Sequence, residues 1–544
     1  MGIGCYGPRP GSLKQLRTDG RISSIGPDIY QYTCQDSYTF MEAAKIELKM
    51  MIDKVGSSAI KRVQFNSISL DNFNADQHLN HLLQIYDLFS FARPSFYINF
   101  SNCHQSASLL GLAKVIEKFR NDLEFIGLNF EPFEEEETNL TEEAISTLVK
   151  TLAKHKELKE IAITLKLIET PSKMIQKLLM IPLEIESIKG IKLRIIDCVN
   201  VGTSEMLLFV KNLEESKKEL TNFCLEYTLS NNMKIEESQA HANMSSVWIT
   251  QLFDHLHTMT SLKKLGFACQ SCLFLDSKAF ASIFNSKTKA TSIDEFRFEC
   301  KGVSHLIWDG EVGLITKFLE TLNQIAHLQL GFVDQPSFDN AVLSALVSKL
   351  DTLTNLKSLD LDLKNTNISE KGLAGLACLK SLPKLQVLKL DLQLCFGKFL
   401  STLSDINIGL FALKEYQVST SKADNLMKFC ESLKFLKGLT MLKLNLQNFV
   451  LSMECAKELG HTLMELNALI KVEIYLVDVV IEKKNNNNAI LDLAREVKLH
   501  PSLDVFNFNL TRCNINPTDH PIEELEKILS TAKNLQSFGW SLNA

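Results

Sequence analysis

One pattern constrains the fold of this chain more than any other feature: a short run of apolar residues recurs with fixed spacing. The stretch LKSLDLDLKNTNI has apolar residues at the positions that we number 1, 4, 6, 8 and 13 (Leu356, Leu359, Leu361, Leu363 and Ile368). Three further segments fit the same template and begin at Leu439, Leu469 and Leu503. Four matches of this quality indicate an internal repeat.

A relaxed template, which accepts any apolar residue, extends the repeat along most of the chain. It adds units that begin at Ile60, Leu123, Leu158, Ile188, Leu220, Leu262, Ile293, Ile325, Leu385, Leu413 and Leu535. A weaker unit surrounds Phe96, Ile98 and Phe100. The units begin about 30 residues apart, and about 16 units of that length are typical of a solenoid.

Each unit combines a strand with a helix. Positions 4, 6 and 8 alternate, so their side chains share one face of a short strand. An amphipathic helix follows; in one unit its apolar face comprises Leu343, Leu346, Val347 and Leu350. Strands and helices that alternate at this period predict an α/β fold, with a parallel sheet on the concave side and helices on the convex side.

This pattern resembles the leucine-rich-repeat superfamily, and the repeat length with one helix per unit is most similar to its ribonuclease-inhibitor-like subgroup. The chain departs from the family pattern at position 8, which is apolar, and the usual Asn is displaced or missing. The resemblance implies a horseshoe-shaped solenoid that binds proteins on its concave face. We therefore divide the chain into a Gly/Pro-containing arm (1–37), an N-terminal capping helix (38–56) and a leucine-rich-repeat solenoid (57–544).

Composition and charge exclude several classes of protein. The formal net charge is -6, so there is no excess of Lys and Arg to neutralise a nucleic-acid backbone. No apolar run reaches the roughly 18 residues of a membrane-spanning helix, and the first residues lack the apolar stretch of a secretory signal. We therefore expect a cytoplasmic protein whose thirteen cysteines are reduced.

The sequence also lacks the common catalytic signatures, including those of phosphate-binding loops, zinc proteases and serine hydrolases. Cys269 and Cys272 form a CxxC pair, but no second pair completes a four-ligand metal site. Position 11 is cysteine in five units (Cys103, Cys198, Cys272, Cys395 and Cys513). We expect these thiols to be packed under the bend that follows each strand, and we expect no catalytic residue, cofactor or metal.

The register identifies candidate partner-binding residues, because side chains at positions 5 and 7 point away from the buried positions 4, 6 and 8. The candidates are Arg297, Glu299, Asp360, Asp362, Lys389, Asp391, Lys443 and Tyr475. Lys389 should neutralise Asp360, whereas Asp362 and Asp391 should stand side by side as like charges. This acidic spot would fit a basic group of a partner; the alternative is a solvated polar sheet.

The N-terminus offers a second hypothesis. Gly2 follows the initiator Met, Cys5 is close to it, and a short basic segment follows. Myristate on Gly2 with palmitate on Cys5 would supply the two signals that stable membrane anchoring needs. Tyr6 stands where the myristoylation pattern has Ser or Thr, and the alternative is a simple leader. Membrane association is expected only if this acylation occurs.

Three other segments depart from the regular repeat. The stretches 230–246 and 485–488 interrupt the repeat and are predicted to be polar loops. The unit that begins at Leu535 supplies a final strand without a helix, which leaves a parallel sheet edge as a candidate contact surface for a partner or a second copy.

The sequence thus favours a non-catalytic protein-binding scaffold, and it does not identify the partner. Two alternatives stay open: a fixed structural subunit of a large cytoskeletal or ciliary assembly, and a lipid-anchored adaptor. Association with the cytoskeleton or with a membrane would follow from these alternatives.

Overall fold

A computed structural model of the chain describes most of the 544 residues. The described residues are 20–26, 29–34, 41–70, 75–89, 94–119, 122–131, 139–166, 171–198, 201–229, 245–272, 275–285, 292–303, 308–369, 372, 375–393, 395, 420–446, 450–451, 453–476, 480–481, 486–510 and 521–541. They fall into two compact units, an N-terminal unit within Leu13–Ile283 and a C-terminal unit within Phe284–Ala544.

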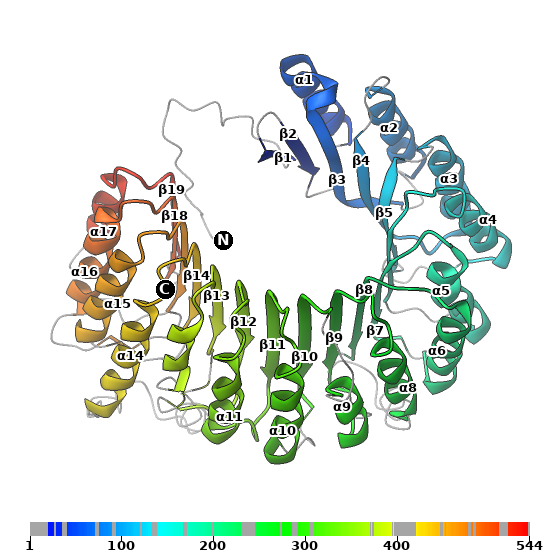
Figure 1. Ribbon diagram of the computed structural model, residues 1–544. Coiled ribbons are helices and arrows are strands. Elements are labelled where there is room, and N and C mark those ends of the chain that lie inside the picture. The colour runs from blue at the N-terminus through cyan, green and yellow to red at the C-terminus, as the bar shows by residue number, and fades with distance from the viewer. Residues whose placement is uncertain are drawn as a thin grey trace, which may run out of the picture. The chain divides into compact units, whose positions relative to one another are not determined.

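The N-terminal unit alternates strands and helices from its third strand onward (Figure 1). Its strands are β1 (Gly20–Gly26), β2 (Ile29–Cys34), β3 (Ile60–Ser69), β4 (Ser95–Ser101), β5 (Leu123–Phe130), β6 (Glu160–Lys166), β7 (Gly190–Ile196), β8 (Asn222–Thr228) and β9 (Lys264–Gln270). Its helices are α1 (Met41–Val55), α2 (Ala75–Asp87), α3 (Ser106–Ile116), α4 (Glu142–Leu152), α5 (Ser172–Glu184), α6 (Thr203–Ser216), α8 (Val247–Leu256) and α9 (Ser277–Ile283), with short 3-10 helices η1 (Ser57–Ala59) and η2 (Glu117–Phe119).

The C-terminal unit repeats the same alternation. Its main strands are β10 (Glu295–Lys301), β11 (His327–Val333), β12 (Ser358–Asp362), β13 (Val387–Asp391), β14 (Met441–Asn445), β16 (Lys471–Tyr475), β18 (Val505–Asn509) and β19 (Ser537–Ser541). Two short strands, β15 (Val450–Leu451) and β17 (Val480–Ile481), pair with each other. Its helices are α10 (Trp308–Leu319), α11 (Asn340–Leu350), η3 (Leu376–Ser381), α14 (Thr420–Leu433), α15 (Met453–Glu465), α16 (Asn486–Leu499) and α17 (Pro521–Ser530).

All strands of these repeats pair in parallel with their neighbours inside each unit. Helices cover one face of each sheet (Figure 1), and we call the other face the open face. Seven such strands, β3 to β9, lie in the described part of the N-terminal unit, and eight lie in that of the C-terminal unit. The predicted α/β repeat fold is confirmed.

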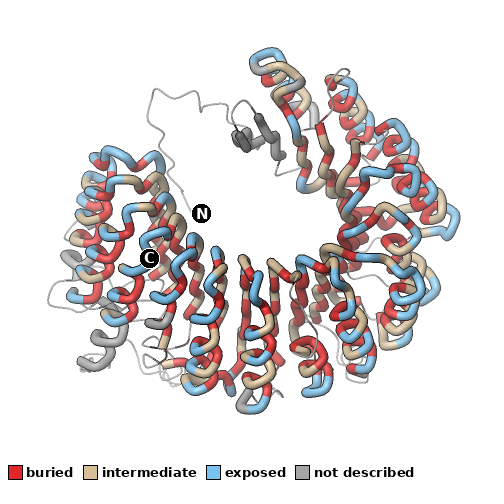
Figure 2. The backbone as a smooth tube through the Cα atoms, viewed as in Figure 1, coloured by how far each residue is buried: buried red, intermediate tan, exposed pale blue. Residues whose placement is uncertain are grey.

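The core of each unit lies between the sheet and the helices. Figure 2 shows the buried residues concentrated on the strands and on the helix sides that face them. The template leucines Leu359, Leu361 and Leu363 have no solvent exposure, at 0% each. The helical residues Leu343 and Leu346 are equally buried and lie on α11, as predicted. Burying one such side chain contributes about 1.5–3 kcal/mol, so the repeated apolar pattern is the main source of stability.

The bend after each strand has a recurring backbone feature. In six units the residue at position 10 has a positive φ: Asn102 at 58°, Asp197 at 52°, Ser271 at 55°, Gly302 at 64°, Asp334 at 57° and Asn365 at 53°. Gly, Asn and Asp tolerate this left-handed conformation better than other residues. The bend turns position 11 back under the sheet, which explains why that side chain is buried.

The position-11 cysteines occupy this buried place. Exposure is 0% for Cys103, 1% for Cys198, 0% for Cys272 and 6% for Cys395, so the expected burial is confirmed; Cys513 lies outside the described residues. The Cys272 thiol donates to the carbonyl oxygen of Tyr227 in the preceding unit at 3.4 Å. Burial raises the pKa of Cys103 to about 12 and that of Cys395 to about 11, so these thiols are poor nucleophiles.

Two units of the C-terminal half use larger polar side chains at position 11. Thr366 Oγ1 donates to the Leu363 carbonyl oxygen at 2.7 Å. The amide of Gln335 donates to the Val303 carbonyl oxygen at 2.9 Å and accepts from the Val303 N–H at 3.0 Å. Gln335 therefore joins two neighbouring repeats through backbone groups of Val303, whereas Thr366 pairs with a carbonyl group of its own repeat.

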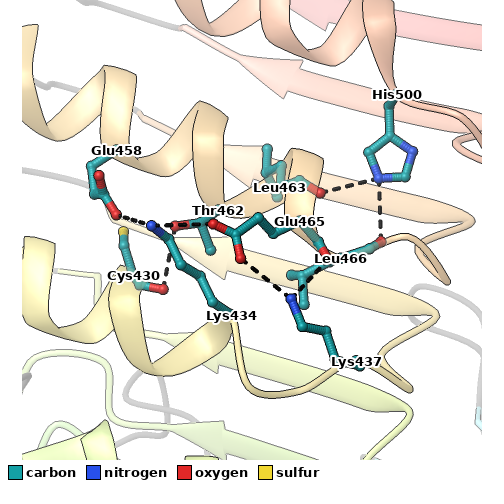
Figure 3. Close-up of polar contacts among 9 residues, drawn as sticks. All are labelled: Cys430, Lys434, Lys437, Glu458, Thr462, Leu463, Glu465, Leu466 and His500. Atoms are coloured by element: carbon teal, nitrogen blue, oxygen red, sulfur yellow. Dashed lines mark hydrogen bonds and ion pairs between the residues drawn. The ribbon is translucent and has the colours of Figure 1, made fainter.

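Polar contacts also connect neighbouring helices (Figure 3). Lys434 Nζ lies 2.7 Å from Glu458 Oε1 and 3.5 Å from Glu465 Oε1, which ties the end of α14 to α15. His500 Nε2 lies 3.1 and 3.3 Å from two backbone carbonyl oxygens near the end of α15. A helix C-terminus leaves carbonyl groups unpaired, so the histidine of the next repeat completes it.

The structure corrects three sequence predictions. The segment 1–37, expected to precede the first strand, contains the antiparallel hairpin of β1 and β2, and β2 pairs in parallel with β3. Asn486 begins α16 instead of belonging to a loop, because Asn is favourable at a helix start. The predicted strand after Leu413 lies outside the described residues, and β13 pairs directly with β14, so no strand separates them.

Candidate protein-interaction surface

The open face of the C-terminal unit contains all eight predicted partner-binding residues. The strands β12, β13, β14, β16 and β18 share one burial pattern, in which buried residues alternate with partly exposed ones. Asp360 and Asp362 flank the buried Leu361 on β12, and the same alternation holds on the neighbouring strands. The side chains at positions 5 and 7 therefore point to the open face, as the register predicted.

Lys389 and Asp360 form the expected ion pair. They are direct neighbours in the register of β12 and β13, and Lys389 Nζ lies 3.2 Å from Asp360 Oδ2. The two side chains are 39% and 25% exposed. An ion pair this accessible contributes about 0.2–1 kcal/mol, so it orients the side chains more than it stabilises the fold.

Asp362 and Asp391 stand side by side on the same two strands, as predicted. Burial and the neighbouring Asp391 carboxylate raise the pKa of Asp362 to about 6. The backbone N–H of Lys364, which donates to Asp362 Oδ1 at 3.2 Å, opposes that shift. Two carboxylates held on adjacent strands repel each other, and the repulsion makes one of them easier to protonate.

Hydrogen bonds fix the second carboxylate in place. Asp391 Oδ1 accepts from the backbone N–H of Gln393 at 3.0 Å, and Asp391 Oδ2 accepts from Asn445 Nδ2 at 3.0 Å. The acidic spot, by which we mean Asp362 and Asp391, is thus held in place by hydrogen bonds to both carboxylates.

The other predicted residues flank the acidic spot on both sides. On β10, Arg297 Nη2 donates to Glu299 Oε2 at 2.6 Å, and the Gln329 amide donates to the other oxygen of Glu299. Glu299 leans over Gly331, where an added Cβ would lie 3.0 Å from its Cγ. Gly331 neighbours Asp362 on the next strand, so the glycine gives Glu299 room beside the acidic spot.

Lys443 and Tyr475 lie on the opposite side. Lys443 Nζ is 5.3 Å from the centre of the Tyr475 ring, within the range of a cation–π contact. Next to them, Lys471 Nζ lies 2.7 Å from Glu473 Oε1. Burial raises the pKa of Glu473, but the hydrogen bond and the charge of Lys471, together with Lys443 and Asn507, outweigh burial and place the net pKa below the ordinary value. These four residues pair with one another. Among the described residues, the acidic spot forms no ion pair with a cation.

A second group of open-face residues was missed by the sequence interpretation. In the N-terminal unit, Arg62 of β3 lies over the Tyr97 ring of β4, with its guanidinium carbon 4.0 Å from the ring centre. The Tyr97 ring stacks with Phe125 of β5 at a centroid distance of 6.2 Å and an interplanar angle of 13°. The sequence signal was a single aromatic residue at a partly exposed position of β4 and of β5, and shifts in register obscure that Tyr97 and Phe125 are neighbours.

The structure describes only some of the remaining predicted features. Gly2 and Cys5 lie outside the described residues, and so does most of the interruption at 230–246. β19 pairs with β18, and Phe538 at its position 4 is partly exposed, whereas Phe506 at the same position of β18 is buried.

Within the described ranges, no group of three or more His, Cys, Asp and Glu side chains is arranged to hold a metal ion. Over the same part of the chain, none of the helices combines the length and apolar character needed to cross a bilayer.

Comparisons with known proteins give no further guide. The sequence matches no protein-family model, and a search of curated proteins finds no similar sequence.

Proposed function

We propose that this protein is a non-catalytic scaffold that binds a partner protein on the open face of its C-terminal unit. The observation that carries the proposal is the acidic spot, where Asp362 and Asp391 are fixed side by side on adjacent strands. A partly buried pair of like charges is unfavourable in the free protein. A cation from a partner would relieve the repulsion, so binding would gain energy from a feature that destabilises the free scaffold.

The rigidity of the sheet supports this proposal. The strand backbones that carry the acidic spot are hydrogen-bonded on both sides, by β11 and β14. Asp391 is further held by two hydrogen bonds. Side chains that are already ordered lose little conformational entropy when a partner binds. The partner group that fits best is a Lys or Arg side chain.

We also propose that the chain is a divergent leucine-rich-repeat protein of the ribonuclease-inhibitor-like kind. The strand template, the helix in most units and the buried position-11 side chain that bonds to the preceding repeat support this assignment. Proteins of this class bind other proteins through the open face of the sheet, which agrees with the place of the acidic spot.

Charge reversal at the acidic spot tests the function. Immobilised wild-type protein and the double variant Asp362→Lys with Asp391→Lys are incubated with a native extract, and the captured proteins are compared by quantitative mass spectrometry. We expect the variant to lose at least one stoichiometric partner by tenfold or more while its melting temperature stays close to that of the wild type.

The matched control is Glu454→Lys with Glu526→Lys, which makes the same change of charge at exposed positions of α15 and α17. It should capture the partner as the wild type does. Equal capture by all three proteins would refute the open-face proposal. If the partner resists extraction at high salt, the scaffold is a fixed structural subunit; if the protein itself follows membranes, the lipid-anchored alternative gains support.

A further inference from the structure

The open face of the N-terminal unit contains a stack of three side chains from successive strands. Arg62 and Phe125 approach the Tyr97 ring from opposite neighbouring strands, so the order across the sheet is cation, ring, ring. Arg62 Nη2 also donates to the Tyr97 hydroxyl at 3.0 Å. This hydrogen bond and the cation–π contact hold the Tyr97 ring in place on the sheet. We call Arg62, Tyr97 and Phe125 the aromatic stack.

The stack has one end that is not covered. Within the described part of the chain, Tyr97 is the one ring that packs against Phe125. The next residue across the sheet is Glu160 on β6, directly opposite Phe125 in the register. The Glu160 side chain leans away over Gly190, where an added Cβ would lie 2.7 Å from Glu160 Cγ, and its carboxylate accepts from the Asn222 amide. The glycine therefore leaves the far side of Phe125 accessible.

The charges around this end favour a cation. Glu124 neighbours Phe125 in the sequence and accepts from Ser95 Oγ at 2.6 Å and from the Tyr97 hydroxyl. Lys159 lies 4.0 Å from Glu124, at the limit of an ion pair. Among the described residues, Glu160 makes no ion pair. Glu160 is therefore the carboxylate beside Phe125 that makes no ion pair in the described part of the chain, whereas Glu124 has Lys159 close to it.

We propose that the accessible side of Phe125 binds the guanidinium group of an arginine in a partner protein, stacked on the ring and paired with the Glu160 carboxylate. This cation would repeat, at one end of the stack, the arrangement that Arg62 makes at the other. Arginine fits better than lysine because its planar group stacks on a ring and pairs with a carboxylate at the same time. The surface is separate from the acidic spot, so each proposal can fail without the other.

Saturation-transfer NMR on the full-length protein tests the proposal with defined peptides. The probe is the peptide Gly-Ser-Gly-Arg-Gly-Ser-Gly, and the comparison peptide has citrulline, which keeps the shape but not the charge, in place of arginine. We expect transfer to the arginine side chain and at least fivefold less to citrulline. Phe125→Leu, which keeps an apolar side chain without a ring, and Glu160→Gln should each reduce transfer by at least fivefold.

The matched control is Phe435→Leu, which makes the same kind of change at a ring that is 66% exposed and lies between α14 and β14, outside the open face. It should leave transfer unchanged, and circular dichroism should give the same spectrum for every variant. Equal transfer to both peptides, or full transfer in Phe125→Leu, would overturn the proposal. So would Phe125-dependent binding of a ten-nucleotide oligothymidine, which would assign the stack to nucleic acid instead.

Discussion

The two units of the molecule build the same repeat with different regularity. In the C-terminal unit the described strand pairs keep one register from β10 to β19. In the N-terminal unit the register shifts between Tyr30 and Gln31, between Phe65 and Ile68, and between Phe96 and Tyr97. A shift of one residue changes which side chains are neighbours and can move them to the other face.

The same difference extends to the core and the open face. Leucine fills positions 4, 6 and 8 of β12, whereas the unit around β4 packs an aromatic cluster in which Phe96 lies 5.1 Å from Phe119 and 5.6 Å from Tyr86 between ring centres. The open face is acidic near Asp362 and aromatic near Tyr97. The C-terminal unit also packs rings in its core, near Phe296 and Phe318, so the clearest contrast between the units lies on their open faces.

The largest expected effect concerns the two cores. Phe96→Ala removes a ring from the aromatic cluster and should lower the free energy of unfolding by about 3–5 kcal/mol, whereas Leu361→Ala should lower it by about 2–5 kcal/mol. Each substitution should raise hydrogen exchange mainly in the adjacent repeats, because a repeat contacts only its neighbours. Denaturant unfolding with hydrogen exchange measures both. Exchange that rises equally along the whole chain would contradict the repeat description.

The contrast between the units also explains how much could be predicted from the sequence. Most strands of the C-terminal unit and the pairs Asp360–Lys389 and Asp362–Asp391 followed from counting along the leucine template, because the register there never shifts in the described strands. The exception is the strand expected after Leu413, since β13 pairs directly with β14. The stack of Tyr97 and Phe125 could not be found by counting, since bulges precede it. The hairpin of β1 and β2 was missed because its pairing is antiparallel and lies outside the repeat.

The second prediction compares position 11 in the two units. Gln335→Leu leaves the N–H and carbonyl groups of Val303 without their partner, and the free energy of unfolding should fall by about 1–3 kcal/mol. Cys198→Ala removes a weaker donor, which lies 3.3 Å from the Ile196 carbonyl oxygen, and should cost about 1 kcal/mol. Urea denaturation of both variants checks this order. A smaller loss for Gln335→Leu would show that the amide does not join the repeats.

The third prediction concerns the loss of stability at low pH, and it compares a buried histidine of each unit. Burial lowers the pKa of His257 and of His500 and outweighs the nearby carbonyl groups, which raise it. The unfolded chain then binds protons more readily, so stability is complete above about pH 6.5 and falls as the pH decreases below that value.

Glutamine keeps a hydrogen-bond donor without titrating, so His257→Gln and His500→Gln should each reduce the loss of stability between pH 7.5 and pH 5. Urea midpoints at the two pH values measure that loss. If neither variant changes the pH dependence, the histidines do not sense acid, and carboxylates elsewhere must account for it.

The smallest expected effect is a gain in stability, and it concerns Asp362 of the C-terminal unit. The raised pKa of Asp362, about 6, means that its ionised form is disfavoured in the folded state. Asp362→Asn should therefore stabilise the protein at pH 7.5, by about 1 kcal/mol, and this gain should vanish near pH 4, where the carboxyl is protonated. Thermal melts at both pH values measure this change. The control is Asp360→Asn, which removes the same charge but breaks an ion pair. Stabilisation by Asp362→Asn alone indicates repulsion between Asp362 and Asp391, whereas stabilisation by both variants indicates a general effect of the lower negative charge.

The central claim, that partners bind the open face, is tested most directly by site-specific photo-crosslinking. A photoreactive amino acid replaces Gln329 or Asn445 on the open face, or Glu454 on helix α15 as the reference position, and crosslinked proteins are identified after irradiation in native extract. The account predicts that one partner crosslinks from both open-face positions and at least tenfold less from position 454. Crosslinks that arise chiefly from position 454 would contradict it and would assign recognition to the helices.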